Sequence, residues 1–132
     1  MKYLLDTHTL IWTLFDTPKL SDTVKGIIRD PANDIFVSAI NFWEISIKVG
    51  SGKLGLGAVT PESLPETCLD HGFEFINLDV QEASSFYRLA AAYHKDPFDR
   101  MLIWQAINRN HILLTNDENI AKYNSEGLKV VW

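Results

Sequence analysis

The sequence holds a single cysteine, Cys68, so no disulfide can form within the chain. A chain without disulfides fits a reducing compartment, and we expect a cytoplasmic protein. Long apolar runs are missing too. The first leucines are followed at once by Asp6, too early for a secretion signal, and nothing later approaches the roughly 20 apolar residues of a membrane span. We therefore expect no membrane partner.

Glycine and proline are sparse, with 7 and 5 residues, and charged residues make up 22% of the chain. This composition excludes a largely disordered protein. At 132 residues and 46% hydrophobic content, the chain is long enough to bury a core of its own. We expect a single domain over residues 1–132.

An excess of basic residues is also missing. The chain has 12 lysines and arginines against 17 acidic residues, a net charge of −5. A protein that coats DNA or RNA through its overall field is normally basic. Either the partner is not a nucleic acid, or it is contacted locally and cations cover some of the acids.

Short apolar runs alternate with helical patterns along the whole sequence. The patterns predict strands at 3–5, 35–38, 73–78, 111–115 and 128–132. They predict helices at 8–15, 22–29, 40–49, 61–69, 79–93, from 97 onward and at 120–123. Such alternation predicts an α/β fold, with a central parallel sheet flanked by helices on both faces.

Two expectations concern packing. The predicted helix 79–93 carries a stripe of small and aromatic residues that is typical of a core or a subunit interface, at Ala83, Phe86, Tyr87, Ala90 and Ala91. Three tryptophans, Trp12, Trp43 and Trp104, fall at core spacing in their helices, which favours burial over base stacking.

Four acidic residues occupy similar places in the predicted elements. Asp6 ends the first strand and Asp117 lies just beyond the fourth, while Glu44 and Asp99 lie in the first turns of two helices. Ligands of parallel sheets bind outside the carboxyl ends of the strands. Each acid alone is explained by a helix cap or a surface pair, but together we expect them to gather at one edge.

Glu44 is the acid least like a cap. A pair with Lys48, four residues on, would contribute roughly 0.2–0.5 kcal/mol. Pressing an unpaired carboxylate against the apolar neighbours of Glu44 costs several kcal/mol. This imbalance favours a functional role for Glu44.

Gathered carboxylates repel, by roughly 3 kcal/mol for a pair about 5 Å apart at an effective dielectric near 20. Protonation relieves the repulsion in part, and a hard divalent cation relieves it more fully. Oxygen ligands without histidine or cysteine at ligand spacing point to Mg²⁺ or Mn²⁺. Such an ion keeps open positions for phosphate oxygens and activates water. The residues therefore predict metal-assisted hydrolysis of a phosphodiester.

The same residues closely resemble PIN-domain ribonucleases and, more narrowly, VapC-like toxins of type II toxin–antitoxin modules. The resemblance runs from Asp6 to the C-terminus. Its motifs are Leu4-Leu5-Asp6-Thr7-His8, Val37-Ser38-Ala39, Trp43-Glu44-Ile45, Gly52-Lys53-Leu54, His94-Lys95-Asp96-Pro97-Phe98-Asp99-Arg100 and Leu113-Leu114-Thr115-Asn116-Asp117. As a set these motifs are highly specific, although Asp-Thr-His or Thr-Asn-Asp alone is not.

This resemblance implies a Mg²⁺- or Mn²⁺-dependent endoribonuclease. By position, the family's acidic quartet, which serves as catalytic and metal-binding site, falls on Asp6, Glu44, Asp99 and Asp117. Similar toxins act as homodimers on RNA and are silenced by a cognate antitoxin that covers the acidic site. The implied protein is thus a hydrolase with RNA, an antitoxin and a second copy of itself as partners.

Several neighbours of the quartet have simpler interpretations. Asp96 precedes Pro97 as an N-cap should, and Asn41 stands where the family often has a small hydroxyl residue, a change that we expect to affect capping. We expect Arg100 to pair with an acid. We expect structural hydrogen bonds from His8 and His94. Ser38 and Thr115 either make such bonds as well or orient a metal-bound water. Lys53 is placed to touch a phosphate.

Other functions fit less well. A phospho-acceptor receiver domain needs a second acid beside Asp6 and a lysine closing the last strand, and Lys129 lies within a strand instead. A haloacid-dehalogenase-type phosphatase needs an aspartate where His8 stands. A binding protein without catalysis, regulated by a metal or a partner, stays open, as does cleavage of DNA.

Overall fold

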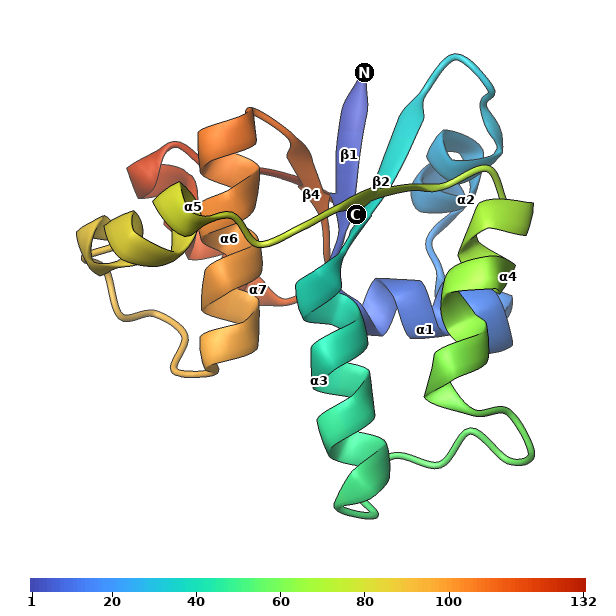
Figure 1. The fold of residues 1–132 in the computed structure, drawn as a ribbon. Coiled ribbons are helices and arrows are strands. Elements are labelled where there is room, and N and C mark those ends of the chain that lie inside the picture. The colour runs from blue at the N-terminus through green and yellow to red at the C-terminus, as the bar shows by residue number, and fades with distance from the viewer.

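Five parallel strands form one sheet in the order β3-β2-β1-β4-β5 (Figure 1). The structure, a computed structural model, describes all residues 1–132. The strands are β1 (Lys2–Leu5), β2 (Asp34–Ser38), β3 (Glu74–Ile76), β4 (Ile112–Leu114) and β5 (Lys129–Val131). The predicted α/β fold with a central parallel sheet is confirmed.

Helices cover both faces of this sheet. In Figure 1, α1 (Thr7–Phe15), α2 (Asp22–Arg29) and α4 (Leu64–Asp70) lie on one side, and α5 (Val80–Ser85), α6 (Pro97–Arg109) and α7 (Glu118–Ala121) lie on the other. Short 3₁₀ turns span Thr17–Lys19, Pro61–Ser63, Phe86–Arg88 and Lys122–Glu126. None of the helices combines the length and the apolar character that crossing a membrane requires.

Two apolar cores follow from the alternation of side chains along the strands. Tyr3 and Leu5 of β1 point to the core beneath α1, α2 and α4, and Leu4 between them points to the core beneath α6 and α7. The helix α3 (Ala39–Gly50) contributes Ile45 to the first core and Ile40 to the second. It therefore anchors both layers at the end of β2.

The direction of the chain reverses between β1 and β4. The first three strands are added toward one edge of the sheet, and the chain then returns to place β4 and β5 on the other side of β1. Such a switch point leaves a crevice at the carboxyl ends of the two diverging strands. Asp6 follows β1 at this crevice, and Asp117 follows β4.

The prediction of one helix over residues 79–93 is wrong. Its first turns form α5 and the following 3₁₀ turn, but residues 89–96 are irregular. The freed backbone groups are bound by distant side chains. Arg100 donates to the carbonyls of Leu89 and Ala91 at 2.8 and 2.7 Å, and the Glu126 carboxylate accepts from Ala90 and Ala91 amides. The proposed stripe on this helix therefore does not exist.

Replacing Arg100 with methionine is expected to lower the free energy of unfolding by on the order of 2–4 kcal/mol. The change would leave the Leu89 carbonyl without a donor and the Ala91 carbonyl with the Tyr123 hydroxyl as its remaining donor, and it would remove the bond to the Tyr123 hydroxyl at 2.8 Å. Urea unfolding of the two proteins measures the difference. The exposed Arg88, changed to methionine, is the control and should shift stability by less than about 0.5 kcal/mol. Equal losses in the two variants would contradict this role for Arg100.

Candidate active site

Asp6 is held at the junction of β1 and α1. One oxygen of its carboxylate accepts from the Thr9 amide at 2.7 Å, which caps α1. The side chain is buried, and burial raises the pKa of this carboxyl, with hydrogen bonds from Thr115 and Thr9 opposing the rise. The predicted capping role is therefore confirmed, and the acid also faces the crevice between β1 and β4.

Glu44 lies on α3, which starts with a capping box. Ser38 accepts from the Ile40 amide and Asn41 accepts from the Ser38 amide. Asn41 therefore takes part in the cap of α3. Glu44 is only 1% exposed. One of its oxygens pairs with Lys48, as the spacing predicts, and the other, Oε1, is buried without any hydrogen-bond partner.

Asp99 lies in the first turn of α6, one turn inside the cap. Asp96 accepts from the Phe98 and Asp99 amides, which confirms it as the N-cap. Burial first, and then the nearby charges of Glu44, Asp96 and Asp6, raise the pKa of Asp99 to about 7 against the opposing effect of His94. Asp99 is therefore within electrostatic reach of three other acids, as expected for carboxylates gathered at one edge.

Asp117 joins the group through a histidine. It caps α7 by accepting from the Asn119 amide at 2.8 Å, and its other oxygen lies 3.1 Å from His94 Nε2. The same nitrogen lies 3.3 Å from Asp99 Oδ2. Because His94 Nδ1 accepts from the Asp96 amide, Nε2 is the nitrogen that donates to the two carboxylates. His94 is hydrogen-bonded as predicted, but its partners are site acids.

The neighbouring polar residues divide into two groups. Thr115 accepts from the Asp117 amide, and Ser38 donates to Gln105 at 2.6 Å, so both make hydrogen bonds at the ends of strands. Two predictions are wrong. Arg100 pairs with no acid because backbone carbonyls occupy its guanidinium, and His8 is exposed beside Trp12 and makes no hydrogen bond.

This arrangement fits a hard divalent cation. One ligand atom from each of His94, Asp99 and Asp117 lies within 4.8 Å of the other two. Oε1 of Glu44 has no hydrogen-bond partner, and burial together with neighbouring acids raises the pKa of Asp99. A cation would balance these charges. The sequence interpretation left His94 out of this cluster because its contacts depend on the irregular segment that precedes α6.

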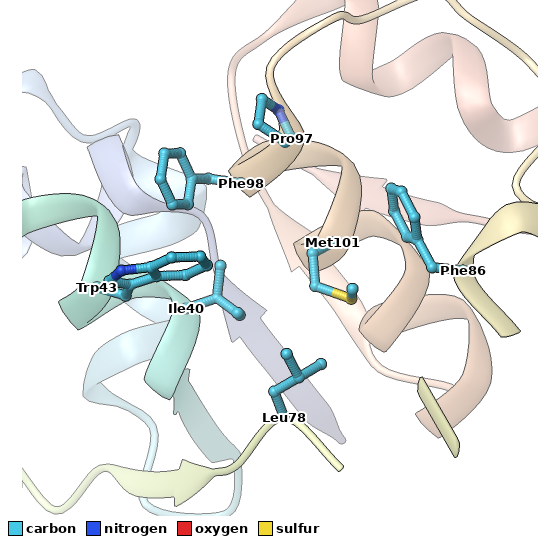
Figure 2. A pocket seen from close by; sticks show the side chains of 7 residues that line it. All are labelled: Ile40, Trp43, Leu78, Phe86, Pro97, Phe98 and Met101. Carbon is cyan, nitrogen blue, oxygen red and sulfur yellow. The ribbon is translucent and has the colours of Figure 1, made fainter. Parts of the chain in front are cut away.

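An apolar pocket of about 200 Å³ lies between α3 and the start of α6 (Figure 2). It is lined by Ile40, Trp43, Leu78, Phe86, Pro97, Phe98 and Met101. Trp43 is the neighbour of Glu44, and its ring meets Phe98 edge-on at 5.1 Å. Trp43 is 57% exposed, so the prediction that it is a core residue is wrong. On α3 the Trp43 ring lies where no other helix or strand covers it.

Comparisons with known proteins agree with the fold. The sequence matches the family described as PIN domain over residues 3–126. The structure superposes on a chain of VapBC2 from Rickettsia felis, bound to a promoter DNA fragment, with a TM-score of 0.72 and 18% identity, covering 99% of this chain and 98% of that one. For VapBC-1 from nontypeable Haemophilus influenzae the TM-score is 0.68 with 18% identity, covering 99% and 97%. For FitAcB from Neisseria gonorrhoeae it is 0.65 with 19% identity, covering 98% and 96%. No curated protein sequence matches the chain.

Proposed function

The chain belongs to the PIN-domain family, and from this premise we propose that it is a metal-dependent endoribonuclease, the toxin of a type II toxin–antitoxin module. The observation that carries the proposal is the meeting of Asp99 with Asp6, Glu44 and the His94–Asp117 pair at the switch point of the sheet. PIN domains are nucleases, whereas a receiver domain and a dehalogenase-type phosphatase belong to other families. We propose one PIN domain over residues 1–132.

In this proposal Asp6, Glu44, Asp99 and Asp117 hold Mg²⁺ or Mn²⁺. The bound ion would activate water and stabilise the leaving oxygen of the phosphodiester. Glu44 offers a free buried oxygen, and Asp99 must lose its proton to become a ligand. His94 orients Asp99 and Asp117 through Nε2. The helix caps made by Asp6 and Asp117 use one carboxylate oxygen each, and the other oxygen of Asp117 faces His94.

The partner that we propose is an antitoxin that covers the acidic site. The superposed VapBC and FitAcB structures are toxin–antitoxin complexes, which supports this class of partner. The apolar pocket is lined by Trp43 and Phe98, which are the chain neighbours of Glu44 and Asp99. A protein segment with apolar side chains in this pocket and a lysine or arginine toward the acids would satisfy both surfaces and displace the metal.

We also propose that the toxin is a homodimer that acts in the cytoplasm. Large apolar side chains stay exposed in the single chain, among them Trp43, Ile47, Val80 and Tyr87, and a second copy would remove part of this surface from water. The buried, unpaired Cys68 fits a reducing compartment. Light scattering of the purified chain measures the oligomeric state.

The proposed function is tested by incubating purified protein, free of antitoxin, with a pool of structured RNA and with single-stranded DNA of matched sequence. We expect RNA cleavage with Mg²⁺ or Mn²⁺, none with EDTA, and none by the Asp6→Asn and Asp117→Asn variants. Cleavage in EDTA, or wild-type turnover by either variant, would contradict the proposed site. Cleavage of DNA alone would keep the metal site and change the substrate class. Metal binding without cleavage of any substrate would favour a non-catalytic binding protein.

A further inference from the structure

A second hollow, of about 470 Å³, shares no lining residue with the apolar pocket. It lies between α1, the 3₁₀ turn Thr17–Lys19 and the segment that follows α3, and its lining begins at Thr7, directly after Asp6. It extends to Lys19 and Phe15 at the far end of α1. The hollow therefore leads away from the acidic site along the surface of the protein.

Three lysines line this hollow, although the whole chain carries −5. Lys19, Lys48 and Lys53 line it, and the one acid in the lining is Asp16, which pairs with Lys19 at 3.3 Å. Lys48 pairs with Glu44 and so stands at the border with the acidic site. Lys53 is exposed and its ammonium group makes no hydrogen bond or ion pair, which leaves it available for an anion.

The backbone at the end of α3 positions Lys53. Gly52 adopts a left-handed conformation with φ of 77°, and the Lys53 amide then donates to the Lys48 carbonyl at 2.9 Å. This turn reverses the chain and brings Lys53 back beside the helix rather than beyond its end. Two cationic side chains thus lie in one hollow although their residues belong to different elements.

Aromatic rings line the same hollow. Trp12 is half-buried, and the exposed His8 ring lies 5.8 Å from it at a tilt of 45°. The Lys19 ammonium lies 5.8 Å from the centre of the Trp12 ring. Rings beside cations are the combination by which proteins bind single-stranded nucleic acid, since bases stack on the rings and phosphates meet the cations. A duplex keeps its bases stacked on each other and offers no free face to Trp12.

We propose that this hollow binds the single-stranded RNA segment next to the phosphate that is cleaved, with a base against Trp12 and His8 and a phosphate on Lys53. The inference rests on the proposed ribonuclease function and adds where the substrate strand lies. It also explains how an acidic protein binds a polyanion, because the contact is local. Few phosphates are contacted, so the dependence of binding on salt should be shallow.

The test measures binding separately from cleavage. In the Asp99→Asn background, which removes turnover, fluorescence anisotropy follows a labelled single-stranded RNA of mixed sequence at several salt concentrations. We expect Lys53→Ala to weaken RNA binding several-fold. The slope of the logarithm of the binding constant against the logarithm of the salt concentration should become shallower by about 0.7, for the one phosphate contact that is lost. Trp12→Leu should weaken binding about 5-fold or more, and Trp12→Phe, which keeps a ring, should lose less. Lys129→Ala, an exposed lysine on β5 outside the hollow, is the matched control and should bind as the parent does.

Two sets of results separate this inference from the proposed function. If the wild-type protein cleaves RNA while the Lys53→Ala and Trp12→Leu variants bind RNA as their Asp99→Asn parent does, the function stands and the inference is overturned. If nothing is cleaved but those variants still lose RNA binding, the nuclease proposal fails and the binding site stands. Unchanged RNA binding together with weaker binding of an oligoglutamate peptide would assign the hollow to an acidic protein segment and overturn the inference.

Discussion

Replacing Asp99 with asparagine is expected to abolish cleavage and at the same time to stabilise the metal-free protein. Replacing a residue that only orients a metal ligand typically lowers metal affinity or activity 10–100-fold. Replacing a ligand itself should therefore reduce activity on the order of 100-fold or more. The pKa of Asp99 rises from 3.8 to about 7 on folding. Between these values the unfolded chain releases the proton while the folded chain keeps it. Stability therefore falls as the pH rises from about 4 to 7 and stays low above that.

Asparagine removes this cost because it carries no charge at any pH. At pH 8 and without metal, we expect Asp99→Asn to raise the free energy of unfolding on the order of a few kcal/mol, and at pH 4 to change it little. Thermal unfolding in EDTA at the two pH values measures both effects. Asp22→Asn is the matched control, since Asp22 also lies in the first turn of a helix but is exposed. A variant less stable than the wild type at pH 8 would show that the acids around Asp99 do not repel it.

Adding Mg²⁺ or Mn²⁺ is expected to stabilise the wild-type protein and to be required for activity. A saturating ion at about 100 times its dissociation constant adds about 2.7 kcal/mol to the free energy of unfolding. Binding must displace the proton from Asp99, whose pKa is about 7. We therefore expect the apparent metal affinity to be constant above pH 7 and to fall by up to about tenfold per unit below it.

Titration calorimetry with Mn²⁺ at pH 6, 7 and 8 measures this dependence, together with the protons released on binding. The Asp99→Asn variant should bind more weakly and lose the dependence centred near pH 7, because it has no proton to release at that position. The Asp22→Asn control should reproduce the wild-type curves. An affinity that does not change between pH 6 and 8 would contradict Asp99 as the titrating ligand.

The local sequence determined most of the fold and the general position of the acids. Alternating apolar runs and capped helices are encoded within a few residues, so the parallel sheet and the caps at Asp6 and Asp96 were predictable. Because parallel strands all end at one edge, Asp6, Glu44, Asp99 and Asp117 were predictable as neighbours without coordinates.

Long-range contacts decided the rest. The helix predicted through Tyr93 stops early because Arg100 and Glu126, distant in sequence, bind its backbone groups. The irregular segment that results places His94 between Asp99 and Asp117, a contact that no local pattern encodes. Similarly, helical spacing placed Trp43 on an inward face, but only the packing of whole elements decides whether another layer covers that face. The periodicity of the sequence specifies on which side of a helix or strand a side chain lies. The tertiary structure specifies whether another element or water lies on that side.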